Sequence, residues 1–421
     1  MARFEPTPRQ RLRGAVQLAG TGFDRVAEQI HQFHRAISDL PFERLAPVPV
    51  VAAGSQTTRV IHDAITDGVY AGARLAGGAL FGAAALALRA VEAIAATPPE
   101  TRPSAALDGI NSAVNGLVGD FLAAERNPLA VRLGFYAHGQ RLPLTRAALA
   151  AAQPKPTGRL AIFVHGLCCN EDSWRLYAEP GDPETEPYPQ RLHVDLGFTP
   201  FFARYNTGLH VSQNGRLLAR ALARLVDAHP EPVREIALIG HSMGGLVSRA
   251  ACHSALRSAA GWTEKVSNVI CLGAPHLGAP LERAVHFGTA VMDAFRLTAP
   301  LAAVLNARSR GIQDLRYGYT ADEDWRGRDP QRQYDARRAP IARLPGARYH
   351  FIGSSIGRSE RDPMGELIGD GLVQLPSSTA RDLADADTAV LFRTHHLRLL
   401  NHPVVYQQIR SRLTEPVPSR R

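Results

Sequence analysis

The stretch EIALIGHSMGG at residues 235–245 joins an apolar run to a serine that stands between glycines. The apolar part predicts a buried strand, and the G-x-S-x-G part predicts a sharp turn into a helix. Gly240 and Gly244 have no Cβ, so the strand and the helix can approach closely around a strained serine. Ser242 would then be open to a base, with the Met243 N–H beside it as an oxyanion donor. A glycine-rich turn without chemistry is the alternative that this pattern alone leaves open.

A second apolar run, RLAIFV at residues 159–164, ends in the turn His165-Gly166-Leu167. A turn after an earlier strand at the same edge of a sheet can supply the other oxyanion donor. The Leu167 N–H is the candidate for this donor. The His165 side chain is expected to be a structural hydrogen-bonding group.

Two further candidates follow late strands. The run YHFIG at 349–353 predicts a strand, and Asp370 comes after it in GDGLV at 369–373. The run AVLF at 389–392 predicts the next strand, after which histidines occur. Some enzymes with a catalytic triad carry the nucleophile, the acid and the base in this chain order, serine, aspartate, histidine, each in a loop after a strand. Asp370 is the candidate acid, and three histidines are candidates for the base: His395, His396 and His402.

These motifs resemble those of lipase-type serine hydrolases of the α/β-hydrolase superfamily, close to the bacterial lipases and the PGAP-like esterases. The resemblance implies an α/β-hydrolase fold with a mainly parallel central sheet. It implies that Ser242 is the nucleophile, Asp370 the acid, and Leu167 and Met243 the oxyanion donors. The similar segments are FVHGL at 163–167, RYNTGLH at 204–210, GHSMGG at 240–245, CLGAPHLGAP at 271–280, GDGLV at 369–373 and HHLRLLNHPVVY at 395–406.

The resemblance also selects the base and the reaction. The family histidine stands directly before an L-x-L-L run, which implies that His396 is the base. The implied activity is hydrolysis of carboxylic esters through an acyl-enzyme, with esters of lipids or long acyl chains favoured as substrates. An acyl-thioesterase or acyltransferase with the same triad is one alternative, and a non-catalytic interaction protein of this fold is another. No cofactor and no metal ion are expected.

Composition agrees with a folded enzyme. The chain has 421 residues, of which 45% are hydrophobic and 21% charged, as in globular proteins with a sizeable core. The formal net charge of +9 comes almost entirely from arginine, because Lys155 and Lys265 are the only lysines. The basic residues are spread along the chain, and no phosphate-binding or RNA-binding motif occurs. We therefore expect a small ester or lipid substrate and no nucleic-acid partner.

The N-terminal part differs from the rest. Residues 1–126 show apolar residues at helical spacing and predict a helical region, and residues 127–421 predict the catalytic domain. The uncharged run 75–88 is too short to span a bilayer. The region is expected to cover the catalytic domain or to form a homodimer, with contact to a membrane surface as the alternative. The first twenty residues lack the apolar stretch of a secretory signal, which predicts a cytoplasmic protein that is either free or peripheral to the membrane.

Other segments predict features around the serine. The strand pattern lapses between residues 276 and 345, and the resemblance implies a cap or lid insertion over Ser242 there, with ordinary covering helices as the alternative. Its apolar residues Phe295 and Leu301 are the candidates for contact with the acyl chain. The segment YNTG at 205–208 is expected either to line the pocket or brace the nucleophile loop, or to be a structural turn. The cysteines are expected to be small apolar side chains near the sheet: Cys168, Cys169, Cys252 and Cys271.

Overall fold

The computed structural model divides the chain into two compact units. Unit 1 contains residues 1–101, 126–129 and 299–307, and unit 2 contains residues 102–125, 130–298 and 308–421. The structure describes residues 6–24, 28, 67, 71–72, 74–90, 105–137, 139–153, 155–179, 181–279, 309–327, 338–362, 369–379 and 387–415.

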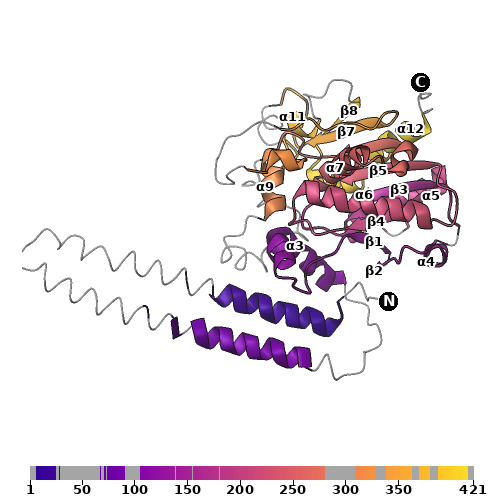
Figure 1. The fold of residues 1–421 in the computed structure, drawn as a ribbon. Helices are drawn as coiled ribbons and strands as arrows, with labels where there is room; N and C mark the ends of the chain where they lie inside the picture. Colours follow the sequence, from indigo (N-terminus) through magenta and orange to yellow (C-terminus); the bar gives the residue numbers. More distant parts are fainter. Residues whose placement is uncertain are drawn as a thin grey trace, which may run out of the picture. The chain divides into compact units, whose positions relative to one another are not determined.

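Unit 2 is built on a sheet of eight strands in the order β2-β1-β4-β3-β5-β6-β7-β8. The strand β1 is antiparallel to β2 and β4, and every other neighbouring pair is parallel. The predicted α/β class with a mainly parallel sheet is therefore confirmed (Figure 1). The strands are β1 (Gly134–Ala137), β2 (Gln140–Arg141), β3 (Arg159–Val164), β4 (Thr199–Arg204), β5 (Glu235–His241), β6 (Val266–Leu272), β7 (Arg348–Ser355) and β8 (Asp387–Phe392).

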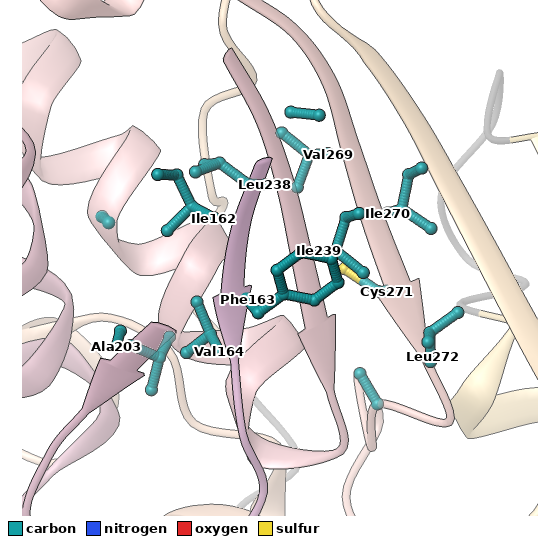
Figure 2. Close-up of a cluster of buried hydrophobic side chains, with 14 of the residues drawn as sticks. Ile162, Phe163, Val164, Ala203, Leu238, Ile239, Val269, Ile270, Cys271 and Leu272 are labelled. Carbon is teal, nitrogen blue, oxygen red and sulfur yellow. The ribbon is translucent and has the colours of Figure 1, made fainter. Parts of the chain in front are cut away.

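The central strands are mostly apolar because helices cover both faces of a parallel sheet. Every residue of β6 is buried, and so is every residue of β3 after its first. Figure 2 shows Ile162 and Phe163 of β3 beside Leu238 and Ile239 of β5, with the β6 residues Val269, Ile270, Cys271 and Leu272 beyond them. Burial of this apolar surface is the main stabilising contribution to unit 2.

The directions of the crossovers decide which helices cover which face. The connection from β3 to β4 runs one way along the sheet, whereas those from β4 to β5 and from β5 to β6 run the other way. Crossovers between parallel strands are right-handed, so α5 covers one face while α6 and α7 cover the other. The helices α6 and α7 pack against each other, and α5 contacts α12 (Figure 1). The helices of unit 2 include α3 (Ala105–Ala124), α4 (Arg146–Ala152), α5 (Tyr188–Leu196), α6 (Val211–Ala228), α7 (Met243–Arg257), α9 (Arg310–Tyr317), α11 (Leu375–Ser378) and α12 (Pro403–Thr414).

Unit 1 contains two described helical stretches, at residues 8–24 and 74–90. They are joined by the Phe23 and Phe81 rings, whose centroids are 6.1 Å apart, and by an ion pair from Arg74 Nε to Asp24 Oδ1 at 2.7 Å. Large apolar side chains of the second stretch are exposed at Leu75, Leu80 and Leu86. No helix among the described residues has both the length and the apolar character needed to cross a bilayer. Contact of these helices with a lipid surface stays a prediction, which co-flotation with lipid vesicles tests.

The division into units bears on the predicted N-terminal region. The sequence groups residues 102–125 with that region, whereas the structure places them, including α3, in the unit that holds the sheet. The helix α3 contacts α9 and the loops at the carboxyl ends of β3 and β4. The domain boundary after residue 126 stays a prediction.

Candidate active site

The predicted nucleophile lies in a strained turn between β5 and α7. Ser242 has φ 53° and ψ −123°, a backbone conformation that costs a non-glycine residue on the order of 1–3 kcal/mol. The Ser242 N–H donates to the Leu272 carbonyl at 2.8 Å, and the Ser242 carbonyl accepts from the Gly245 N–H at 3.0 Å. A Cβ on Gly244 would overlap the Val164 carbonyl oxygen, so the start of α7 can approach β3 only with glycine there. The surrounding strands therefore hold the serine in its strained conformation.

The structure brings the predicted acid and base together. The Nδ1 of His396 lies 2.8 Å from Oδ2 of Asp370, and both side chains are almost fully buried. The other carboxylate oxygen of Asp370 accepts the N–H groups of Leu372 at 3.0 Å and Val373 at 2.8 Å. The backbone also joins the two residues, because the His396 N–H donates to the Asp370 carbonyl at 3.0 Å. The carboxylate is thereby fixed against one edge of the imidazole.

The backbone after β6 connects this pair with the serine. Ser242 is hydrogen-bonded to Leu272, and the next residue is Gly273, which has φ +60°. A Cβ on Gly273 would lie 3.0 Å from both Nδ1 and Cε1 of His396. The imidazole of His396 and the backbone of Ser242 therefore flank the same two-residue segment. Nε2 is the ring nitrogen opposite Asp370, and it is the atom through which a base in this position would act on the serine.

The predicted oxyanion donors also lie at this edge of the sheet. In the register of β3 and β5, Val164 pairs with Gly240, so the turns that follow both strands begin side by side. A Cβ on Gly166 would lie 3.1 Å from the Cβ of Ser242, which places the first of these turns against the serine. Among the described residues, neither the Leu167 N–H nor the Met243 N–H has a hydrogen-bond acceptor. Both donors are available in the described part of the site.

The two alternative bases, His395 and His402, make contacts other than with Asp370. His395 is exposed and its ring contacts Tyr177, with a centroid distance of 5.7 Å. His402 caps α12, because its Nδ1 accepts the Val404 N–H at 3.2 Å. Of the three candidates, His396 is the one whose ring bonds Asp370.

The sequence interpretation did not assign a role to His241, which precedes the nucleophile. Its Nε2 donates to the His396 carbonyl at 3.2 Å, and the two rings are 4.7 Å apart. Burial, together with the neighbouring His396, lowers the pKa of His241 well below its usual value. A neutral imidazole is therefore packed against the ring of the candidate base. A histidine directly before the elbow serine was the only signal in the sequence.

The YNTG segment braces the turn after β3, which is a different loop from the nucleophile loop named in the prediction. The Tyr205 hydroxyl donates to the His165 carbonyl at 2.7 Å, and the two rings stack at 4.5 Å. The Thr207 hydroxyl oxygen accepts the Cys168 N–H at 3.2 Å. These bonds hold both ends of the turn that contains Leu167.

A buried ion cluster lies behind the same turn, and the sequence did not point to it. Arg204 donates to both carboxylate oxygens of Glu171, from Nε at 2.7 Å and from Nη2 at 2.5 Å. Its Nη1 donates to Oδ2 of Asp108 at 3.0 Å. Arg204 is 4% exposed, so its charge is compensated inside the protein by residues from two other segments.

The remaining predictions concern the cap and the cysteines. Phe295 and Leu301, together with most of the predicted cap, lie outside the described residues. Parts of that segment are described, including α9 and the turn η4 (Asp322–Asp324). All four cysteines are free thiols, and Cys168, Cys252 and Cys271 are buried, as expected for small side chains near the sheet.

The buried histidines predict a dependence of stability on pH. Burial lowers the pKa of His165 from 6.5 to about 3, with the nearby Arg204 adding to the effect. In the unfolded chain this histidine takes up its proton near pH 6.5, whereas the folded chain does not. Below that pH, each such histidine should lower the free energy of unfolding by up to about 1.4 kcal/mol per pH unit.

Urea unfolding of the wild type and of His165→Phe at pH 7.5, 6.5 and 5.5 checks this. The variant loses a titratable group and keeps an aromatic ring beside Tyr205, so its free energy of unfolding should fall less steeply with pH. Equal slopes for the two proteins would contradict the prediction.

Residues 155–326 match the model of the family described as PGAP1-like alpha/beta domain. Similar solved structures include the mature form of the Bacillus licheniformis lipase BlEst2, with 18% identity, a TM-score of 0.41, and coverage of 61% of this chain and 92% of that chain. Another is the esterase RhEst1 from Rhodococcus sp., with 14% identity, a TM-score of 0.34, and coverage of 61% and 91%. None of the curated proteins compared with the chain is a match.

Proposed function

The chain carries a PGAP1-like alpha/beta domain within an α/β-hydrolase fold, and on this basis we propose that it is a serine carboxylic-ester hydrolase. The observation that carries the proposal is the buried bond between His396 and Asp370 at 2.8 Å, beside a serine held at φ 53°. A merely structural turn does not require a strained serine bonded to Leu272 next to Gly273, the residue against which a histidine oriented by a buried carboxylate packs. Ser242, His396 and Asp370 are the proposed nucleophile, base and acid.

The proposed reaction has two halves. Ser242 Oγ attacks the ester carbonyl carbon and passes its proton to Nε2 of His396, while the carboxylate of Asp370 stabilises the imidazolium. The N–H groups of Leu167 and Met243 bind the negative oxygen that forms. The C–O bond to the alcohol then breaks, and the alcohol leaves with the proton from His396.

The second half of the reaction regenerates the free enzyme. A water molecule attacks the acyl-serine with His396 again as base, and the carboxylic acid is released as Ser242 regains its proton. The site contributes two preorganised N–H donors and a base of fixed orientation. Lipid or long-chain acyl esters are the proposed substrates, since the sequence resembles the lipases.

The test is labelling with a fluorophosphonate, followed by a panel of substrates. We expect the wild type to form a covalent adduct at Ser242, found by mass spectrometry of the digested protein, and Ser242→Ala to form none. A wild type that resists labelling would exclude the activated serine and favour the non-catalytic alternative.

Substrate choice then separates the enzymatic alternatives. We expect hydrolysis of p-nitrophenyl esters, with turnover of short esters, triglycerides, phospholipids and acyl-thioesters compared at one enzyme concentration. Faster release of thiol than of alcohol would identify a thioesterase. Product esters formed only when an acceptor alcohol is added would identify an acyltransferase, because both alternatives use the same acyl-enzyme.

A further inference from the structure

The helix α3 lies outside the residues that match the family, yet it packs against the loops behind the candidate oxyanion donors. A Cβ on Gly116 would overlap Sγ of Cys168 and would lie 3.2 Å from both the N and the Cα of that residue. One turn further along the helix, the Gly119 carbonyl accepts a hydrogen bond from Nδ2 of Asn206 at 2.8 Å. Between the two glycines, α3 is kinked at Val118, whose φ is −135°. The helix backbone is thus in direct contact with the turn after β3.

That turn has a strained residue next to Leu167. The Cys169 N–H donates to the Gly166 carbonyl at 3.3 Å, so Leu167 and Cys168 are the two central residues of a tight turn. Cys168 has φ +61°, and glycine or asparagine is the usual residue for a positive φ at the second central position. A cysteine persists in this conformation only where its surroundings hold it there.

Cys168 is held from two sides. On one side, its N–H donates to Oγ1 of Thr207 at 3.2 Å. On the other side is α3, where Gly116 faces the cysteine backbone and the Ala113 carbonyl lies 3.8 Å from the Sγ. Cys168 is 6% exposed, so solvent does not substitute for either contact.

The ion cluster ties the same helix to the far side of the turn. Asp108 lies in the first helical turn of α3, and Glu171 begins the turn η1 (Glu171–Arg175), two residues after Cys169. Arg204 bridges their carboxylates inside the protein. The turn after β3, which contains Leu167 and Cys168, therefore lies between two contacts with α3, one at Gly116 and one through Arg204.

We propose that α3 is part of the catalytic site, as the element that positions the Leu167 N–H for the oxyanion, with Gly116 as the positioning residue. This inference rests on the proposed function, because it concerns the transition state of that reaction. The backbone of Gly116 supports the strained Cys168, and Cys168 fixes the turn that aims Leu167. An oxyanion donor acts when negative charge develops, so misplacing it lowers kcat more than it changes substrate binding.

The test is the variant Gly116→Ala in the full-length chain, assayed with a p-nitrophenyl ester. We expect kcat to fall roughly 10- to 100-fold while KM changes by less than about twofold, since one donor is displaced and the triad is left intact. Gly109→Ala is the matched control, because it is on the same helix and a Cβ there meets nothing within 4 Å. It should keep the wild-type kcat.

A second variant separates positioning from damage to the fold. In Gly116→Ala/Cys168→Ala the overlapping Sγ is removed, so kcat should recover toward the value of Cys168→Ala alone. This comparison also applies if Gly116→Ala by itself does not fold, which thermal unfolding reports. A merely structural glycine would predict loss of folded protein with an unchanged kcat for the folded fraction, quantified by fluorophosphonate titration.

The outcomes distinguish the inference from its premise. A fully active Gly116→Ala, or a double variant that stays as slow as Gly116→Ala although it is folded, overturns the role of α3 and leaves the triad in place. A wild type that neither reacts with the fluorophosphonate nor hydrolyses esters overturns the proposed function, and the inference with it.

Discussion

Replacing Ser242 by alanine is expected to lower kcat for ester hydrolysis by roughly 10⁴- to 10⁶-fold, because the acyl-enzyme cannot form without the hydroxyl. The remaining rate should come from the oxyanion donors and from substrate binding alone. Initial rates with a p-nitrophenyl ester measure the loss. Circular dichroism should show an unchanged fold, since alanine removes one oxygen and keeps the turn.

Ser267→Ala is the matched control for this loss. Ser267 is a buried serine near the start of β6, and its hydroxyl donates to Glu235 at 2.8 Å, at the opposite end of the sheet from Ser242. Its removal should leave kcat near that of the wild type. Retention of more than a tenth of the activity by Ser242→Ala would show that the reaction does not use this nucleophile.

Replacing His396 by alanine is expected to have an effect as large as the loss of the serine, because the three residues act as a unit. Asp370→Asn should lower kcat less, by roughly 10³- to 10⁴-fold, since the base remains but its orientation and its charge are no longer supported by a carboxylate. Steady-state kinetics of the purified variants on one ester give both values.

His395→Ala is the control for the choice of base. His395 is adjacent in sequence, but its ring contacts Tyr177 and does not bond Asp370, so its loss should change kcat only slightly. If His395→Ala were inactive and His396→Ala active, the assignment of the base would be wrong.

The strands were the part of the fold that the sequence predicted best. The run predicted at 159–164 is β3 with the same bounds, and the runs at 235–239 and 349–353 lie within β5 and β7. Buried parallel strands are continuous apolar runs, so they are visible without knowledge of their neighbours. The same logic placed Asp370 and the candidate histidines in loops after late strands, because such loops meet at one edge of the sheet. The resemblance to the lipase-type hydrolases then selected His396 among the three histidines.

Features that depend on distant residues could not be predicted. The start of the helix α6 at Val211 is one of these features. The reason is Asp314, whose carboxylate accepts the Val211 N–H at 2.7 Å from 103 residues away. The brace formed by Arg204 and the contact of Gly116 with Cys168 are of the same kind. Neither contact can be recognised from a local sequence pattern, since the partners come together only in the folded chain.

The order of the strands has a consequence for how the chain can be divided. The family match ends at residue 326, before β7 and β8, and it begins after β1 and β2. A fragment cut at these limits would keep the elbow serine but lack both Asp370 and His396. It would also turn β4 and β6, which are paired on both sides in the intact sheet, into open edges with unpaired N–H and C=O groups. Such edges are templates for aggregation, so a fragment with the limits of the family match should aggregate more readily than a chain with the intact sheet.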